Sequence, residues 1–83
     1  ILPKEQQVMD YSNMASVLID LGRYEEALEH YKESLDIAIE LNNNDSIALI
    51  YLSIADARRL INQNEEALEY CKKAIVLYKE LNI

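Results

Sequence analysis

The sequence contains the same five residues, EEALE, at residues 25–29 and again at residues 65–69, a spacing of 40. When residues 11–43 are aligned with residues 51–83 at this spacing, 11 of the 33 pairs are identical. A fixed period of this length is typical of chains built from stacked supersecondary units. The sequence therefore predicts two equivalent structural units.

Each unit is expected to contain two helices. The 83 residues include one Gly and one Pro, too few to supply the turns of a β protein. Gly22 can end the first helix in a left-handed conformation, and Asn62 stands at the same place in the second unit. The predicted fold is all-α, with four antiparallel helices forming two tandem helix-turn-helix hairpins, a fragment of an α-solenoid. We expect a single domain over residues 1–83, with repeat one at about 3–42 and repeat two at about 43–83.

The turn between the two units has the sequence NNNDS, at residues 42–46. Asn, Asp and Ser are the residues that best cap a helix N-terminus, because their side-chain oxygens accept hydrogen bonds from unpaired backbone N–H groups. The predicted cap of the third helix is therefore Asn44, Asp45 or Ser46.

The charge and the apolar runs exclude several kinds of partner. A net charge of −7 argues against nucleic acid and against an anionic membrane surface, since both attract Lys and Arg clusters. The longest uncharged run, residues 46–55, is far shorter than the about 20 residues that span a bilayer. The single cysteine cannot form an internal disulfide, so a reducing, cytoplasmic location is expected. The start at Ile1 led us to expect a piece of a longer protein.

No constellation of residues predicts catalysis, a cofactor or a metal ion. His30 is the only histidine, and a helix residue without a nucleophilic partner is more often structural than catalytic. Cys71 is expected to be a small core residue. The repeated glutamates, as at Glu25 and Glu26, lack the central Gly of a calcium loop and predict solvated helix faces. We therefore expect neither catalytic residues nor bound cofactors or metals.

The residue pattern of the repeat resembles that of the tetratricopeptide repeat family, which is W-x2-L-G-x2-Y followed by A-x3-F. The matching positions of the first unit are Tyr11, Met14, Ala15, Leu18, Ala27 and Tyr31. The period of 40 exceeds the usual 34, and Arg58 stands where an aromatic is expected. Lengthened repeats of this kind resemble those of kinesin light chains and of bacterial peptide-sensing regulators.

The resemblance implies a non-catalytic adaptor or scaffold that binds a peptide or a partner helix. In this family the first helices of successive hairpins line a concave groove. The groove residues that this implies are Met9, Ser12, Asn13 and Ser16 from the first helix, and Leu49, Leu52, Ser53, Asp56 and Arg59 from the third. Asn13 stands at a place where the family often binds the backbone of the peptide.

Two alternative functions arise from the last helix and the repeat length. Repeat arrays need a polar cap on their terminal unit, and none follows the second hairpin in this sequence. Ala74, Leu77, Tyr78 and Leu81 are therefore predicted to form a partly exposed patch for stacking or for homo-oligomerisation. The other alternative is a fragment of a peptide-sensing regulator.

Overall fold

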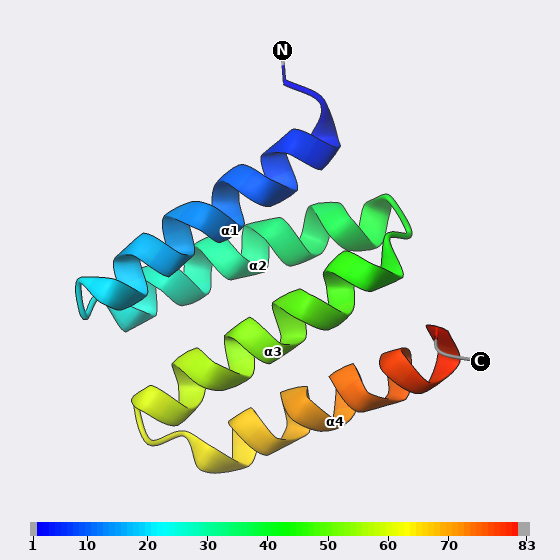
Figure 1. Ribbon diagram of the computed structural model, residues 1–83. Helices are drawn as coiled ribbons and strands as arrows, with labels where there is room; N and C mark the ends of the chain where they lie inside the picture. Colours follow the sequence, from blue (N-terminus) through cyan, green and yellow to red (C-terminus); the bar gives the residue numbers. More distant parts are fainter. Residues whose placement is uncertain (1, 82–83) are drawn as a thin grey trace.

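The computed structural model describes residues 2–81, which form four α-helices (Figure 1). The helices are α1 (Lys4–Asp20), α2 (Tyr24–Glu40), α3 (Asn44–Leu60) and α4 (Asn64–Leu81). The predicted all-α fold with two helical hairpins is confirmed. Ile1 and residues 82–83, which the predicted domain includes, lie outside the described residues.

The four helices lie side by side in chain order, each antiparallel to the next (Figure 1). Helix α1 packs against α2, α2 against α3, and α3 against α4. The body measures 34 × 32 × 15 Å, so its shape is a flat slab. Helices α1 and α4 form its two ends, and each packs extensively against only one other helix.

The three turns share one backbone geometry. Gly22, Asn42 and Asn62 each take positive φ angles, of 77°, 55° and 64°. In each turn the next residue donates its N–H to a carbonyl five residues earlier; in the first turn this bond joins Arg23 N to Leu18 O at 2.8 Å. This is the Schellman arrangement, which satisfies the last carbonyls of a helix. The left-handed positions predicted for Gly22 and Asn62 are confirmed.

The predicted cap of α3 is wrong by one residue or more. The cap is Asn43, whose side chain accepts a hydrogen bond from Ser46 N at 3.2 Å. The turn takes its left-handed residue at Asn42, which places Asn43 just before the helix and draws Asn44, Asp45 and Ser46 into its first turn. Because three asparagines follow one another, the sequence alone does not show which of them is the left-handed residue and which is the cap.

Replacing Gly22 with alanine should destabilise the protein by about 1 kcal/mol, because an L residue with a Cβ is strained at positive φ. No atom lies within 4 Å of the position that the new Cβ would occupy, so backbone strain is the whole effect. Urea unfolding followed by circular dichroism measures the change. Gly22→Asn is the control and should cost less, because asparagine already occupies the other two turns. An alanine variant as stable as the parent would contradict this explanation.

Small residues allow the helices to approach closely. The alanines with no exposed surface are Ala15, Ala27, Ala38, Ala48 and Ala74. Larger side chains then pack around these contacts, including Tyr31, Ile50 and Ile54, which belong to one apolar cluster. Ala15 and Ala27, which stand at two positions of the repeat pattern, are both among these alanines.

One fully buried side chain is polar. Ser34 donates its hydroxyl hydrogen to Val8 O at 2.9 Å and shares a 2.7 Å hydrogen bond with Ser12 Oγ. Forty residues later the same two places hold Ala74 and Leu52. Because a buried hydroxyl without a partner is costly, the two serines are replaced together by two apolar residues.

The packing around Arg58 explains the missing aromatic residue of repeat two. The guanidinium carbon of Arg58 lies 5.6 Å from the centre of the Tyr70 ring, within the range of a cation–π contact. Its Nη1 also donates to Gln63 Oε1 across the turn. The side chain therefore covers the ring of α4 and ties α3 to the turn that follows it.

Candidate functional site

A run of three hollows extends from the space between α1 and α3 to the space between α3 and α4. The first hollow, of about 210 Å³, lies between the N-terminal halves of the two helices. Its predicted groove residues are Met9, Ser12, Asn13, Leu49 and Ser53. The side chains of Met9 and Leu49 are more than half exposed, so a ligand could reach them directly.

The other two hollows continue from the first. The second, of about 270 Å³, is lined by Ser16, Ser53 and Asp56 among others. The third, of about 510 Å³, includes Leu52, Asp56 and Arg59. Ser53 belongs to the first two hollows and Asp56 to the last two, which joins them into one surface. All nine predicted groove residues line this surface, hereafter the peptide face.

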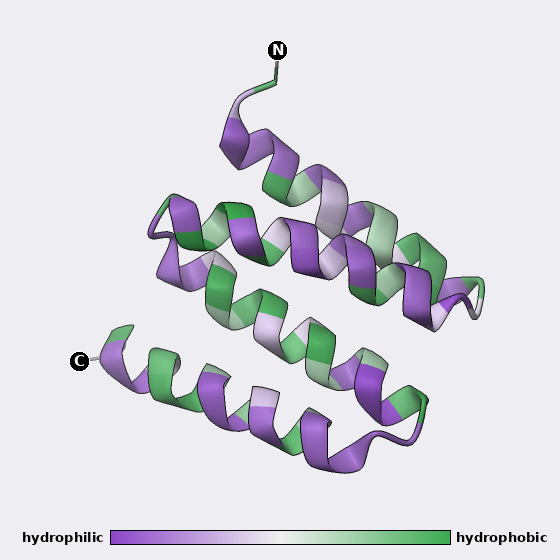
Figure 2. Cartoon of the chain, turned by 180° about the vertical axis from the view of Figure 1, so that it is seen from behind, coloured by the Kyte–Doolittle hydropathy of each residue, from purple (hydrophilic) through white to green (hydrophobic). Residues whose placement is uncertain are grey.

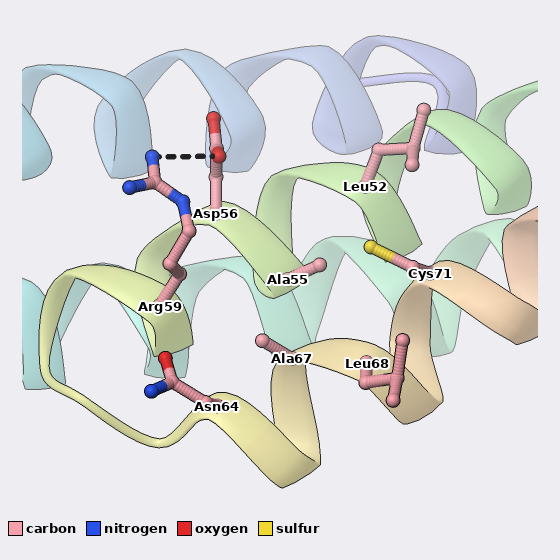
Figure 3. A pocket seen from close by; sticks show the side chains of 8 residues that line it. All are labelled: Leu52, Ala55, Asp56, Arg59, Asn64, Ala67, Leu68 and Cys71. Atoms are coloured by element: carbon pink, nitrogen blue, oxygen red, sulfur yellow. Dashed lines mark hydrogen bonds and ion pairs between the residues drawn. The ribbon is translucent and has the colours of Figure 1, made fainter.

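The third hollow lies between α3 and α4 (Figure 3). Leu52 and Ala55 lie on its α3 side, and Leu68 and Cys71 on its α4 side (Figure 3). Arg59 Nη2 and Asp56 Oδ1 form an ion pair of 3.2 Å at its edge. Both charged side chains are mostly exposed, so the pair contributes little to stability and can exchange for a ligand group.

The polar side chains of the peptide face differ in their availability. Ser12 bonds to Ser34, Ser16 shares a 3.3 Å bond with the Tyr31 hydroxyl, and Ser53 donates to Leu49 O at 3.1 Å. Asn13 is exposed and makes no side-chain hydrogen bond with any residue that the structure describes. Asn13 is therefore the most available of these polar side chains.

The sequence was compared with models of known protein families. A model described as "Tetratricopeptide repeat" matches residues 8–80, which include most of both hairpins. The chain belongs to the tetratricopeptide repeat family. Tetratricopeptide repeats generally mediate protein–protein interactions and are non-catalytic modules. A search of curated protein sequences returned no significant match.

The patch predicted at the end of this tetratricopeptide chain needs a correction at Ala74. Its side chain is fully buried, because it faces inward, as its counterpart Ser34 does. Leu77 is half-buried against the apolar cluster, while Tyr78 and Leu81 are exposed. The sequence prediction missed three more exposed apolar residues of α4, Leu68, Ile75 and Val76.

The remaining candidate residues have structural contacts. His30 of the tetratricopeptide chain is half-buried, with Nδ1 2.9 Å from Glu26 O and its ring 6.1 Å from that of Tyr11. Cys71 was expected in the core but is only half-buried, because within residues 2–81 no helix packs on the outer side of α4. Within residues 2–81 no three His, Cys, Asp or Glu side chains are grouped to hold a metal ion. No helix of this range is long and apolar enough to cross a membrane.

Proposed function

We propose that this tetratricopeptide chain is a non-catalytic adaptor that binds an extended peptide or a partner helix along the peptide face. The observation that supports this function most is the continuity of the three hollows across α1, α3 and α4. Ligand sites in proteins are concave and mostly apolar, with a few polar groups that set orientation. Exposed Met9, Leu49 and Leu52 supply the apolar part, and Asn13 the polar part.

The charge of the protein favours a particular class of peptide. The net charge of −7 repels acidic segments at a distance and attracts basic ones. The exposed carboxylate of Asp56 lies within the peptide face, where it pairs with Arg59, and a basic residue of the peptide would compete for it. A peptide of mixed apolar and weakly basic residues is therefore the proposed ligand. The lone cysteine supports a reducing, cytoplasmic compartment for this interaction.

Two labelled peptides of about ten residues test the ligand class, one alternating Leu, Ser and Lys and its twin carrying Glu in place of Lys. Fluorescence anisotropy measures the binding of each. We expect the basic peptide to bind at least about tenfold more tightly than the acidic one. Equal binding of the two peptides would contradict the charge argument.

Two alanine variants test the location of binding. Leu49→Ala removes an exposed anchor of the peptide face and should weaken binding of the basic peptide by about tenfold. Ile39→Ala is the matched control, because Ile39 is similarly exposed but lies on α2 and lines none of the three hollows. If both variants bound as tightly as the parent, the peptide face would not be the site.

A further inference from the structure

The second hollow of the peptide face, of about 270 Å³, differs from the other two in the chemistry of its lining. The residues that line it all belong to the described part of the chain, and none of them carries a side-chain nitrogen. Its polar side-chain atoms are all oxygens, from Ser16, Asp20, Tyr31, Ser53 and Asp56. Because a carboxylate only accepts hydrogen bonds, this hollow presents mainly acceptors to a ligand.

The hydroxyl hydrogens of the second hollow are largely used within the protein. Ser53 donates its hydrogen to Leu49 O at 3.1 Å. Ser16 and Tyr31 share one hydrogen bond of 3.3 Å, which uses one of their two hydroxyl hydrogens. The side chain of Tyr31 is only 6% exposed, and its hydroxyl has this one partner among residues 2–81. A hydroxyl oxygen has two lone pairs, so these oxygens still have room for a donor from a ligand.

Asp20 lies where a carboxylate does not favour the helix. It is the last residue of α1, and a helix carries a partial negative charge at its C-terminus. Glu40, the last residue of α2, is paired with Lys4, and the last turn of α3 contains Arg58 and Arg59. Asp20 forms no ion pair with any residue that the structure describes. The end of α1 therefore keeps an uncompensated negative charge beside the second hollow.

The exposure of a charged side chain does not by itself mark a site, since hydrophilic residues occur along all four helices (Figure 2). Asp20 is distinguished by its position, which opposes the helix dipole and borders a hollow. Departures from a local rule of this kind are expected at functional sites, where the rest of the fold compensates for them.

The remaining lining of the second hollow suits the stem of a long cationic side chain. Ile19, Ala57 and Leu60 form its apolar part. Lysine and arginine place their methylene stems along apolar surface and keep the charged group near polar atoms. Asp56 already accepts a hydrogen bond of 3.2 Å from the guanidinium of Arg59, which shows that this carboxylate can accommodate a guanidinium donor.

We infer that the second hollow binds an arginine side chain of the peptide, whose guanidinium donates to Asp20 and Asp56. A guanidinium has five N–H donors in one plane, whereas an ammonium has three around a point charge. The acceptor oxygens of the hollow lie on α1, α2 and α3, so the group with more donors can satisfy more of them. This inference rests on the proposed function, because the hollow belongs to the peptide face.

Three labelled peptides of about ten residues test the choice of arginine. They alternate Leu and Ser and differ only at the central residue, which is arginine, lysine or citrulline, the uncharged analogue of arginine. By fluorescence anisotropy, the arginine peptide should bind about tenfold more tightly than the citrulline peptide and about threefold more tightly than the lysine peptide. Equal binding of the arginine and citrulline peptides, or of the arginine and lysine peptides, would overturn the inference.

Asp20→Asn tests the location, because it removes one carboxylate and keeps the size of the side chain. It should reduce the preference for arginine over citrulline to about threefold or less. Asp36→Asn is the matched control, since Asp36 is also exposed but lies on α2 and lines none of the three hollows. This control removes the same charge and should keep the full preference.

Arg59→Gln should act in the opposite direction, because it removes the internal competitor for Asp56. The arginine peptide should bind to it about threefold more tightly than to the parent. Lys79→Gln removes the same charge from an exposed position of α4 outside the three hollows and should have a smaller effect. Weaker binding by Arg59→Gln would make Arg59 a part of the site and would overturn the inference.

Urea unfolding checks that the variants are folded. Asp20→Asn should be at least as stable as the parent, since it removes a charge that is unfavourable at the end of α1. A loss of stability would indicate a structural role for Asp20 and overturn the inference. If the peptides bind and Leu49→Ala weakens them, but Asp20→Asn keeps the full preference for arginine, the inference fails and the proposed function stands. If none of the three peptides binds, both fail.

Discussion

Replacing Tyr31 with alanine should lower the free energy of unfolding by about 3–5 kcal/mol, as for other buried aromatic residues. The ring of Tyr31 is nearly fully buried and lies in one cluster with Ile50 and Ile54 of α3. Its hydroxyl bonds to Ser16 of α1, so this side chain contacts both neighbouring helices. A chain of this length has a total stability of about 4–12 kcal/mol, so the substitution should remove between about a quarter and all of it.

Two further variants separate the packing of the ring from other effects. Cys71→Ala truncates the matching residue of repeat two, which is half-buried, and should cost no more than about 1 kcal/mol. Tyr31→Phe keeps the ring and removes only the hydroxyl, at a similar small cost. Urea titrations of the three variants provide the comparison. Equal losses at Tyr31 and Cys71 would show that the inter-hairpin contact does not stabilise the fold.

Replacing Ala38 with tyrosine should destabilise the protein by about 3 kcal/mol or more. Tyrosine is the residue at the matching position of repeat two, Tyr78. Overpacking a tight contact usually costs about 1–3 kcal/mol, and a whole aromatic ring exceeds the usual change. Ala38 has no exposed surface and faces the cluster that contains Ile47 and Ile50. The ring could enter only if α2 and α3 moved apart.

The reciprocal exchange, Tyr78→Ala, is the control. Tyr78 is exposed at the end of the slab, so its loss should change the stability of the isolated chain by less than about 1 kcal/mol. Thermal unfolding at low protein concentration, where self-association is negligible, measures both exchanges. An Ala38→Tyr variant as stable as the parent would mean that the two hairpins are not closely packed.

The fold could be predicted from the sequence because its signals are local and occur twice. Gly22 and Asn62 mark equivalent turns, and Ala27 and Ala67 mark the same close contact in each hairpin. An internal repeat also removes ambiguity, since any assignment must suit both copies of a position. The family model agrees with this prediction over residues 8–80.

The predictions that were wrong concern positions where the residue type suits more than one structural role. Asn42, Asn43 and Asn44 have the same side chain, and only the backbone geometry assigns one to the left-handed turn and the next to the cap. Ala74 was assigned to an exposed patch because alanine suits either a buried or an open helix face. The position of its counterpart Ser34, bonded to Ser12 across the hairpin, would have indicated the inward direction.

The exposed apolar stripe of α1, formed by Met14, Val17 and Leu21, was missed for a different reason. Met14 and Leu21 follow the spacing of a core stripe, and hydrophobic periodicity does not reveal whether a neighbouring helix is present to cover it. Only the comparison of exposure between the two repeats shows that one copy of the stripe is covered and the other open. The same reasoning applies to Leu68 and Ile75 on α4.

The fully buried alanines also determine how such a molecule can change over evolutionary time. In a slab 15 Å thick, the side chains of residues 2–81 that are shielded completely from water are small: five alanines and Ser34. Together with the larger side chains of the apolar cluster, they specify how the helices pack. The exposed positions are freer to vary, so one scaffold can acquire a new binding specificity and keep its fold.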